Sequence, residues 1–257
     1  MTYTIAVANK KGGAGKTPTS VHLSFALSKA GNKVLYVDAD SQGSGSFHLI
    51  GDAYRKLKET LFDAISEPKE PMRIEPYVVS QTLHMLPSSG QLDDVEVTLM
   101  RKKEYFYQVQ LRKLLLKYPD YDFVVVDTPG YSAGVLTIIS LAAANVVIIP
   151  TATQVGHYDP TLETYGVIEG IRDGGLNPNL KIWGLVLNQL RSNVLHDREI
   201  MEAFKARFKD LVYCEPSRMT NKYADAMSMH VDIRELDPVL GKYWDAIATS
   251  VVKKARE

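Results

Sequence analysis

Residues 4–20 read TIAVANKKGGAGKTPTS, and this stretch decides the fold. The apolar run at residues 5–8 predicts a buried strand. A glycine-rich turn follows it, then Lys16 and Thr17, then an apolar-periodic stretch typical of a helix. A strand, a glycine loop, a Lys-Thr pair and a helix, in this order, are what a phosphate-binding loop requires. The sequence therefore predicts that phosphate groups bind between this strand and this helix.

The residue types of the loop suit that chemistry. Gly12, Gly13 and Gly15 carry no Cβ and can adopt positive φ, so successive backbone N–H groups can turn inward as an anion-binding nest. The helix that begins near Lys16 adds the positive end of its dipole. We expect Lys16 to neutralise charge on the β- and γ-phosphates and Thr17 to offer its hydroxyl to Mg²⁺.

The segment at residues 11–17, KGGAGKT, resembles the deviant Walker A box, KGGxGK[ST], of the ParA/MinD family of ATPases. The resemblance implies that ATP and Mg²⁺ bind here, with Lys16 as the catalytic lysine of the loop and Thr17 as a metal ligand. It also implies that Lys11, likewise catalytic, reaches across an ATP-dependent homodimer to the phosphates bound by the other subunit. The expected nucleotide-binding residues are Lys11, Gly12, Gly13, Ala14, Gly15, Lys16, Thr17 and Pro18.

Pro18 departs from the family pattern, which usually has threonine or serine at this position. Proline is tolerated in the first turn of a helix, because the N–H groups there lack intrahelical partners. It nevertheless removes one N–H donor close to the phosphates.

A second box follows the buried strand expected at residues 33–37, where the sequence continues as Asp38, Ala39, Asp40, Ser41 and Gln42. Two aspartates at the end of a strand are costly unless their charges face solvent or a cation, and their spacing places them on one face. The stretch is similar to the family's DxDPQ box, with Ser41 in place of proline. The resemblance implies that Asp40 positions or activates the attacking water and that Asp38 lies near Mg²⁺ and its waters.

A third box follows the apolar run at residues 123–126, where Asp127 is followed by Thr128, Pro129 and Gly130. Four apolar residues ending in an acid predict a buried parallel strand with a carboxylate at its end, and in phosphate-loop enzymes such an acid holds Mg²⁺. The segment resembles the family's YDxxxxDTPP box, with Gly130 in place of the second proline. Asp127 is therefore the expected Walker B metal ligand.

Two residues are candidates for contact with the adenine base. Asn188 follows the apolar run at residues 183–187, and its amide can both donate to and accept from a base edge. The MinD-like members have an asparagine that does so at this strand end, although a strand-end turn residue is the alternative interpretation. Pro216 follows a short strand expected at residues 211–213 and resembles the family's adenine-packing proline.

The expected fold is a single α/β domain over residues 1–257, with about six parallel strands in a doubly wound, mostly parallel sheet of the deviant Walker A P-loop NTPase type. The three boxes then all lie at the carboxyl ends of strands, so that local motifs and global fold agree. Apolar spacing also predicts helices at residues 54–66 and 101–117 and a last domain helix that includes residues 243–252.

Composition limits the remaining possibilities. The chain has 257 residues, 45% of them hydrophobic, and a formal net charge of zero, so any nucleic-acid surface must be a local patch. Cys214 is the only cysteine, which excludes an internal disulfide, fits a reducing cytosol and argues against a cluster-bearing reductase. The sequence shows no signal-peptide pattern and no apolar run near the ~18 residues of a membrane span. A cytoplasmic location is expected.

The resemblance is to short ParA/Soj-type partition ATPases, and it implies a slow switch. ATP would close a homodimer that binds non-specific DNA on the nucleoid, and a ParB-like or cargo-adaptor partner would stimulate hydrolysis. A MinD-like enzyme bound to membrane through residues 243–252 and a metabolic P-loop enzyme, such as a biotin-synthesis ligase, are the alternatives. The candidate DNA-contacting residues are Lys205, Arg207, Lys209, Arg218, Lys222, Lys253, Lys254 and Arg256.

Overall fold

The computed structural model describes residues 2–67, 70–102, 106–130, 134–191, 193–213 and 216–256. Its centre is one eight-stranded sheet with the strand order β3-β4-β2-β5-β1-β6-β7-β8. Among the described residues, seven strands pair in parallel and β3 alone is antiparallel, beside β4. The strands are β1 (Tyr3–Val7), β2 (Val34–Asp38), β3 (Tyr77–Val78), β4 (Leu83–Leu86), β5 (Phe123–Asp127), β6 (Val146–Ala152), β7 (Lys181–Asn188) and β8 (Val212–Tyr213). The predicted doubly wound, mostly parallel α/β fold is confirmed.

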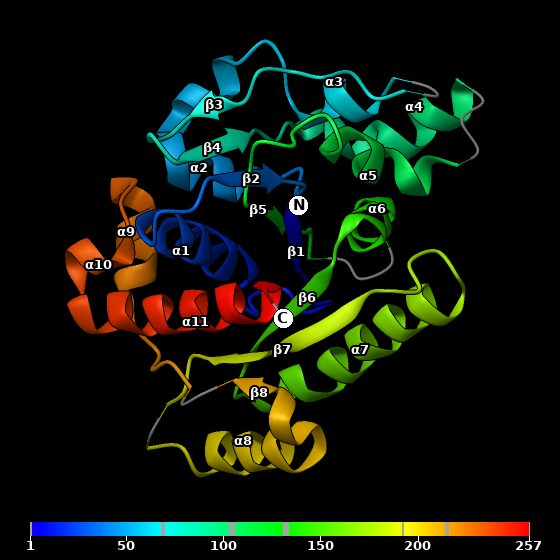
Figure 1. The fold of residues 1–257 in the computed structure, drawn as a ribbon. Coiled ribbons are helices and arrows are strands. Elements are labelled where there is room, and N and C mark those ends of the chain that lie inside the picture. The colour runs from blue at the N-terminus through cyan, green and yellow to red at the C-terminus, as the bar shows by residue number, and fades with distance from the viewer. Residues whose placement is uncertain are drawn as a thin grey trace.

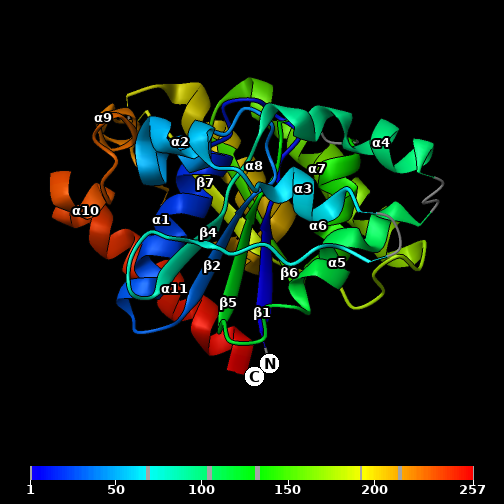
Figure 2. The same cartoon turned by 90° about the horizontal axis from the view of Figure 1, so that it is seen from above.

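Helices cover both faces of this sheet (Figures 1 and 2). One face packs against α1 (Lys16–Lys29), α2 (Ser44–Ile50), α9 (Lys222–Met229), α10 (Ile233–Leu236) and α11 (Pro238–Arg256). The other face packs against α3 (Leu61–Ile65), α4 (Val95–Arg101), α5 (Gln110–Leu115), α6 (Val135–Ala143), α7 (Tyr158–Asp173) and α8 (Leu195–Phe208). Alternate residues of each strand point to opposite faces, so a strand between two helical layers must be apolar throughout. In β1, Ile5 and Val7 belong to the core on the face covered by α1, whereas Ala6 belongs to the core on the opposite face.

The order of the strands brings the three sequence boxes together. β5 lies between β1 and β2, and Asp127 at its end is the register partner of Val7 in β1 and of Asp38 in β2. The carboxyl ends of these three parallel strands therefore lie side by side at one edge of the sheet. In open α/β sheets, ligands bind in the crevice outside these carboxyl ends.

Two predicted helices are shorter than their apolar spacing indicated. In place of one helix at residues 54–66, a 3₁₀ helix (Gly51–Lys56) gives way to extended backbone at Leu57, and α3 begins after Thr60. The reason is local: Thr60 and Asp63 form a capping box that starts a new helix. The helix predicted at residues 101–117 is also wrong, because α4 ends at Arg101, a 3₁₀ turn spans Tyr107–Val109 and α5 covers only Gln110–Leu115. Part of that predicted helix, residues 103–105, lies outside the described residues.

The predicted last helix is confirmed. Trp244, Ile247, Ala248 and Val251 on α11 are all buried in the core shared with α1. Within the described residues, no helix is both long and apolar enough to span a membrane. The apolar face of α11 is therefore occupied by packing within the domain.

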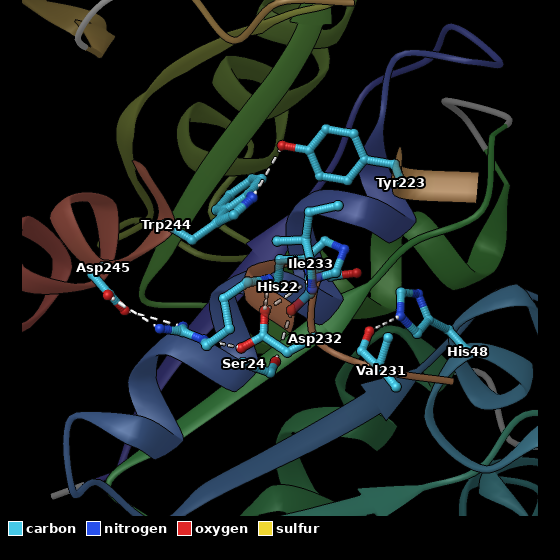
Figure 3. Close-up of polar contacts among 11 residues, drawn as sticks. His22, Ser24, His48, Tyr223, Val231, Asp232, Ile233, Trp244 and Asp245 are labelled. Carbon is cyan, nitrogen blue, oxygen red and sulfur yellow. Dashed lines mark hydrogen bonds and ion pairs between the residues drawn. The ribbon is translucent and has the colours of Figure 1, made fainter. Parts of the chain in front are cut away.

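A buried polar cluster joins α1 to the C-terminal helices (Figure 3). His22 on α1 accepts a hydrogen bond from the backbone N–H of Ile233 at 3.4 Å, while His48 on α2 pairs with the carbonyl of Val231 at 2.9 Å. The two histidine rings lie 5.1 Å apart at their centroids. The helix that begins at the phosphate loop is thus tied directly to the segment that leads into α10 and α11.

Candidate nucleotide-binding site

The first half of the glycine loop is held by Asn9, a residue that the sequence motifs did not single out. The Asn9 amide donates to the carbonyl of Pro150 at 2.8 Å and to the hydroxyl of Thr161 at 3.1 Å. Its carbonyl oxygen accepts from the backbone N–H of Lys11 at 2.9 Å. Asn9 is buried, and two of its partners lie outside the loop, Pro150 on β6 and Thr161 on α7. The loop is therefore anchored to the sheet and to α7 before the glycines begin.

The second half of the loop turns directly into α1. Gly13 and Gly15 have φ of 75° and 89°, which side-chain-bearing residues rarely adopt. Gly15 is the N-cap of α1, and Pro18 is the third residue of that helix. The missing N–H of Pro18 thus belongs to the first turn, where amides lack intrahelical partners, and the helix continues unbroken to Lys29. The N-terminus of α1 therefore faces the loop, as an anion site requires.

The end of β7 packs against the same loop. The Asn188 amide donates to the carbonyl of Ala14 at 3.4 Å, and its oxygen accepts from the Ser217 hydroxyl at 3.2 Å. A Cβ on Gly15 would lie only 2.9 Å from the Asn188 amide nitrogen. Glycine is therefore required there both by its positive φ and by the close approach of Asn188. Pro216 is buried beside Ser217, which brings both predicted adenine contacts to this side of the loop.

Gln189 is a further contact that the sequence analysis missed. Its amide donates to the carbonyl of Gly13 at 2.8 Å, across 176 residues of sequence. It also has a positive φ of 59°, which is uncommon for a residue other than glycine. No motif marked this position, because its contact depends on how β7 ends beside the loop.

Lys16 is buried, and its ammonium group donates to the carbonyl of Lys11 at 3.3 Å. Burial lowers the pKa of Lys16, and the nearby charges of Asp127 and Asp40 oppose that change. Gly130 lies directly over this group, since a Cβ there would be 3.7 Å from the Lys16 nitrogen. Gly130, which stands in place of the second proline of the third box, therefore lies against Lys16 of the phosphate loop.

Asp38 and Asp127 form a pair of buried carboxyl groups at the ends of β2 and β5. Asp38 Oδ2 accepts from both the backbone N–H and the hydroxyl of Ser46, each at 2.7 Å. Burial raises the pKa of both carboxyl groups; the charge of Asp127 adds to the rise at Asp38, whereas Thr17 and Lys16 oppose the rise at Asp127. Asp38 is therefore already satisfied within the protein, while Asp127 is not.

The surroundings of Asp127 fit a magnesium ion. Its Oδ2 accepts from the Tyr36 hydroxyl at 3.0 Å, but its Oδ1 is buried without a hydrogen-bond partner among the described residues. A buried carboxylate oxygen in that state calls for an explanation, such as a cation. The described part of the chain holds no group of three acidic, histidine or cysteine ligands for a metal. A site built from Asp127 and Thr17 and completed by phosphate oxygens and water is what Mg²⁺ commonly uses.

Two clefts open on this region. One of about 720 Å³ is lined by Gly12, Asp40, Gln42, Pro129 and Glu96, among others. Asp40 is half-exposed there, and its carboxylate accepts from the backbone N–H of Gln42 at 3.0 Å. The other cleft, of about 630 Å³, includes Pro216 in its lining. The predicted catalytic aspartate and the predicted adenine proline thus line different clefts. Gly12 of the loop lines the first, and Asn188, which bonds to Ala14 of the loop, also bonds to Ser217 in the lining of the second.

Three comparisons agree with this arrangement. A family model described as an AAA domain matches residues 2–182. The chain is 33% identical over 213 residues to the chromosome partitioning protein ParA of Caulobacter vibrioides, covering 81% of this chain and 78% of that protein. It is 30% identical over 210 residues to the sporulation initiation inhibitor protein Soj of Bacillus subtilis, covering 81% of each.

A solved structure adds information on ligands. A crystal structure titled cobyrinic acid a,c-diamide synthase from Mycobacterium smegmatis, with bound ADP and magnesium, superposes with a TM-score of 0.76 at 28% identity. The match covers 95% of this chain and 96% of that one. A protein of the same fold and of similar extent thus binds a nucleotide together with Mg²⁺.

Proposed function

The chain belongs to the ParA/Soj-type family of partition ATPases, and from this membership we propose that it is an ATP-dependent dimerising switch that positions a cargo on DNA. The cargo would be a chromosome, a plasmid or a protein assembly. The proposal is supported by the position of Lys16, which lies close to the charges of Asp127 and Asp40 and donates to the carbonyl of Lys11. It is also supported by the presence of a lysine at position 11, which a plain phosphate-binding loop would not need.

In the proposed site, loop residues 11–18 hold the ATP phosphates with their backbone N–H groups and with Lys16. Thr17 and Asp127 would hold Mg²⁺, which when bound neutralises phosphate charge that develops during hydrolysis. Asp38 would act on the metal's waters rather than on the metal, since Ser46 already occupies one of its oxygens. Asp40, half-exposed in the larger cleft, would orient the attacking water.

Lys11 would complete the site of a second subunit. Its backbone N–H is held by Asn9, and the residue is half-buried. Its charge lies close enough to His157 to contribute to the lowered pKa of that histidine, after burial. In a dimer with the two loops facing each other, this ammonium group would meet the phosphates bound by the other subunit. ATP would thereby stabilise the dimer, and hydrolysis would release it.

Some of the candidate DNA-contacting lysines already form ion pairs or hydrogen bonds within the chain, and we remove these from the set. Lys205 forms an ion pair with Glu202 at 3.2 Å, and Lys222 forms one with Asp237 at 2.7 Å. Lys254 donates to the carbonyl of Trp183 at 3.2 Å. The candidates that we retain have exposed side chains: Arg207, Lys209, Arg218, Lys253 and Arg256.

The packing of α11 bears on the MinD-like alternative. Membrane binding through residues 243–252 would require an apolar face that lipid can reach, but that face is buried in the core. We therefore propose association with DNA on the nucleoid rather than with membrane. From membership in the ParA family we also propose that a ParB-like or cargo-adaptor protein stimulates hydrolysis.

A metabolic function is the second candidate, because the Mycobacterium smegmatis structure is titled as a synthase. DNA binding separates the two. We expect the protein with a slowly hydrolysed ATP analogue to bind duplex DNA, and the ADP form to bind it far more weakly. Binding should weaken steeply between about 50 and about 200 mM salt, because released counterions drive it.

Arg218→Ala should weaken DNA binding on every sequence and reduce the salt slope by about 1, as expected for one lost phosphate contact. Lys205→Ala is the matched control, since Lys205 is already paired with Glu202, and it should bind DNA almost normally. Equal DNA binding by the ATP-analogue and ADP forms, or none by either, would contradict the proposal. Binding to anionic liposomes in place of DNA would support the MinD-like alternative.

A further inference from the structure

Tyr36 places a buried hydroxyl group next to Asp127 of the proposed metal site. It lies in β2, two residues before Asp38, in a strand that is otherwise aliphatic up to that acid. Its side chain is completely buried, and its hydroxyl donates to Asp127 Oδ2 at 3.0 Å. A tyrosine in such a position is informative, because a buried phenol must find a polar partner.

This hydrogen bond determines which oxygen of Asp127 remains available. The Tyr36 hydroxyl occupies Oδ2, and Oδ1 is left without a partner among the described residues. A phenol carries its proton at neutral pH and a carboxylate has none to give, so the Tyr36 hydroxyl is the donor of this hydrogen bond. The carboxylate is thereby held in one orientation, with a free oxygen on the side away from the phenol.

The chain makes room for this phenol at Gly45, near the start of α2. A Cβ on Gly45 would lie 1.9 Å from the Tyr36 hydroxyl oxygen and 2.7 Å from Cζ, which no rearrangement of a fully buried ring can accommodate cheaply. Gly45 adjoins Ser46, which holds Asp38. The Tyr36 hydroxyl also lies 3.3 Å from the Ser20 hydroxyl on α1, one turn beyond the phosphate loop. The end of β5, the start of α2 and the first turns of α1 therefore all contact the Tyr36 hydroxyl or the space beside it.

We infer that Tyr36 is a positioning residue for the magnesium ligand Asp127: its hydroxyl orients the carboxylate so that Oδ1 faces the metal, and its fit against Gly45 couples that orientation to the Asp38–Ser46 segment. The inference rests on the proposed function only in taking Asp127 as the metal ligand. Groups that hydrogen-bond to a metal ligand commonly tune metal affinity, although they never touch the metal.

The test measures how binding of a fluorescent ATP analogue depends on Mg²⁺ concentration, without any turnover. In Tyr36→Phe, affinity in the presence of EDTA should match the unmodified protein within about twofold. The Mg²⁺ concentration for half-maximal enhancement should rise about 10- to 100-fold, the usual cost of removing a group that hydrogen-bonds to a metal ligand. Tyr118→Phe is the matched control, because it removes an equally buried hydroxyl whose partner is the carbonyl of Ile74.

Two results would overturn the inference: unchanged Mg²⁺ dependence in Tyr36→Phe, or an equal change in Tyr118→Phe. Binding of the analogue by the unmodified protein shows in the same experiment that the nucleotide site itself is present, so failure of the positioning role and failure of the proposed site are distinguishable.

Gly45→Ala provides a second variant that leaves the phenol in place but displaces it. We expect this variant to raise the half-maximal Mg²⁺ concentration at least as much as Tyr36→Phe. In the double variant Gly45→Ala/Tyr36→Leu, which removes the collision, Gly45→Ala should add almost nothing to the effect of Tyr36→Leu alone. Additive effects of the two substitutions would contradict the coupling.

Discussion

Asp38 and Asp127 end neighbouring strands as register partners, and both side chains are completely buried. Two carboxyl groups so placed raise each other's cost of ionisation, since burial already disfavours the charged form. In a protein that only had to be stable, this pair would be a defect. The pair lies at the carboxyl ends of β2 and β5, where ligands bind in open α/β sheets, and this position supports the proposed metal site.

Asp38→Asn should therefore make the nucleotide-free protein more stable. The amide oxygen of asparagine can still accept from Ser46, and the variant avoids the cost of burying or protonating a carboxyl group whose pKa is raised by burial to about 8. Thermal unfolding without nucleotide should shift upward by a few degrees, roughly the effect of 1 kcal/mol in a domain of this size. The same variant should lose ATP hydrolysis. A lowered unfolding temperature with normal hydrolysis would show that Asp38 serves stability and not the site.

Asn188 gives a prediction on base recognition. In Asn188→Ala, the preference for ATP over GTP should fall by about 10-fold, the cost of one hydrogen-bonding group in a buried site. Competition between the two nucleotides for a fluorescent analogue measures it. Gln189→Ala is the control, because Gln189 holds the Gly13 carbonyl of the same loop and should weaken both nucleotides equally. An unchanged preference in Asn188→Ala would make Asn188 a strand-end residue that only supports the loop.

The histidine cluster in Figure 3 predicts acid sensitivity. Burial, followed by the charge of His22, lowers the pKa of His48 to about 4, and burial also lowers the pKa of His22. Two other titratable groups act on the pKa of His48: the charge of His230 lowers it, and the charge of Asp232 raises it. Because the folded pKa lies below the unfolded value of about 6.5, protonation favours unfolding. Stability from neutral His48 is complete above pH ~6.5 and is lost as the pH falls toward ~4.

At pH ~5 this loss amounts to about 2 kcal/mol for His48. His48→Gln should therefore lose less stability than the unmodified protein between pH ~7 and pH ~5, as measured by denaturant unfolding. His196→Gln replaces an exposed histidine on α8 and should follow the unmodified protein. If both variants show the same pH profile as the unmodified protein, the cluster does not control acid stability.

Much of the fold could be predicted because its signals are local. The strands β1, β2 and β5 are apolar runs that end at the three boxes, and their order along the chain predicts a parallel sheet with one site. Lys16, Thr17 and Asp127 were predicted as site residues from their types, from the order of the boxes and from the family resemblance. In the structure Lys16 and Thr17 lie close enough to Asp127 to oppose the rise of its pKa. α11 was also identified correctly, since its apolar residues recur at helical intervals.

One feature that was predicted wrongly is local: the chain is extended at Leu57, and a capping box between Thr60 and Asp63 starts a new helix despite the helical spacing of the segment. The other features that the sequence did not reveal depend on contacts between distant segments. The contacts of Gln189 with Gly13 and of Tyr36 with Asp127 link residues that are 176 and 91 positions apart. A tyrosine within an aliphatic strand was the one visible sign of the second contact. Its partner could be named only once β2 and β5 were seen to be neighbours.

Dimerisation tests the central claim most directly, because Lys11 has no role in a monomeric phosphate-binding loop. Light scattering on the protein with a slowly hydrolysed ATP analogue should give twice the 28.7 kDa of one chain, whereas the ADP form should give one chain. Lys11→Ala should bind the analogue yet remain monomeric. Lys10→Ala is the matched control; Lys10 is paired with Glu163, and this variant should still dimerise. A Lys11→Ala dimer of normal stability would contradict the account.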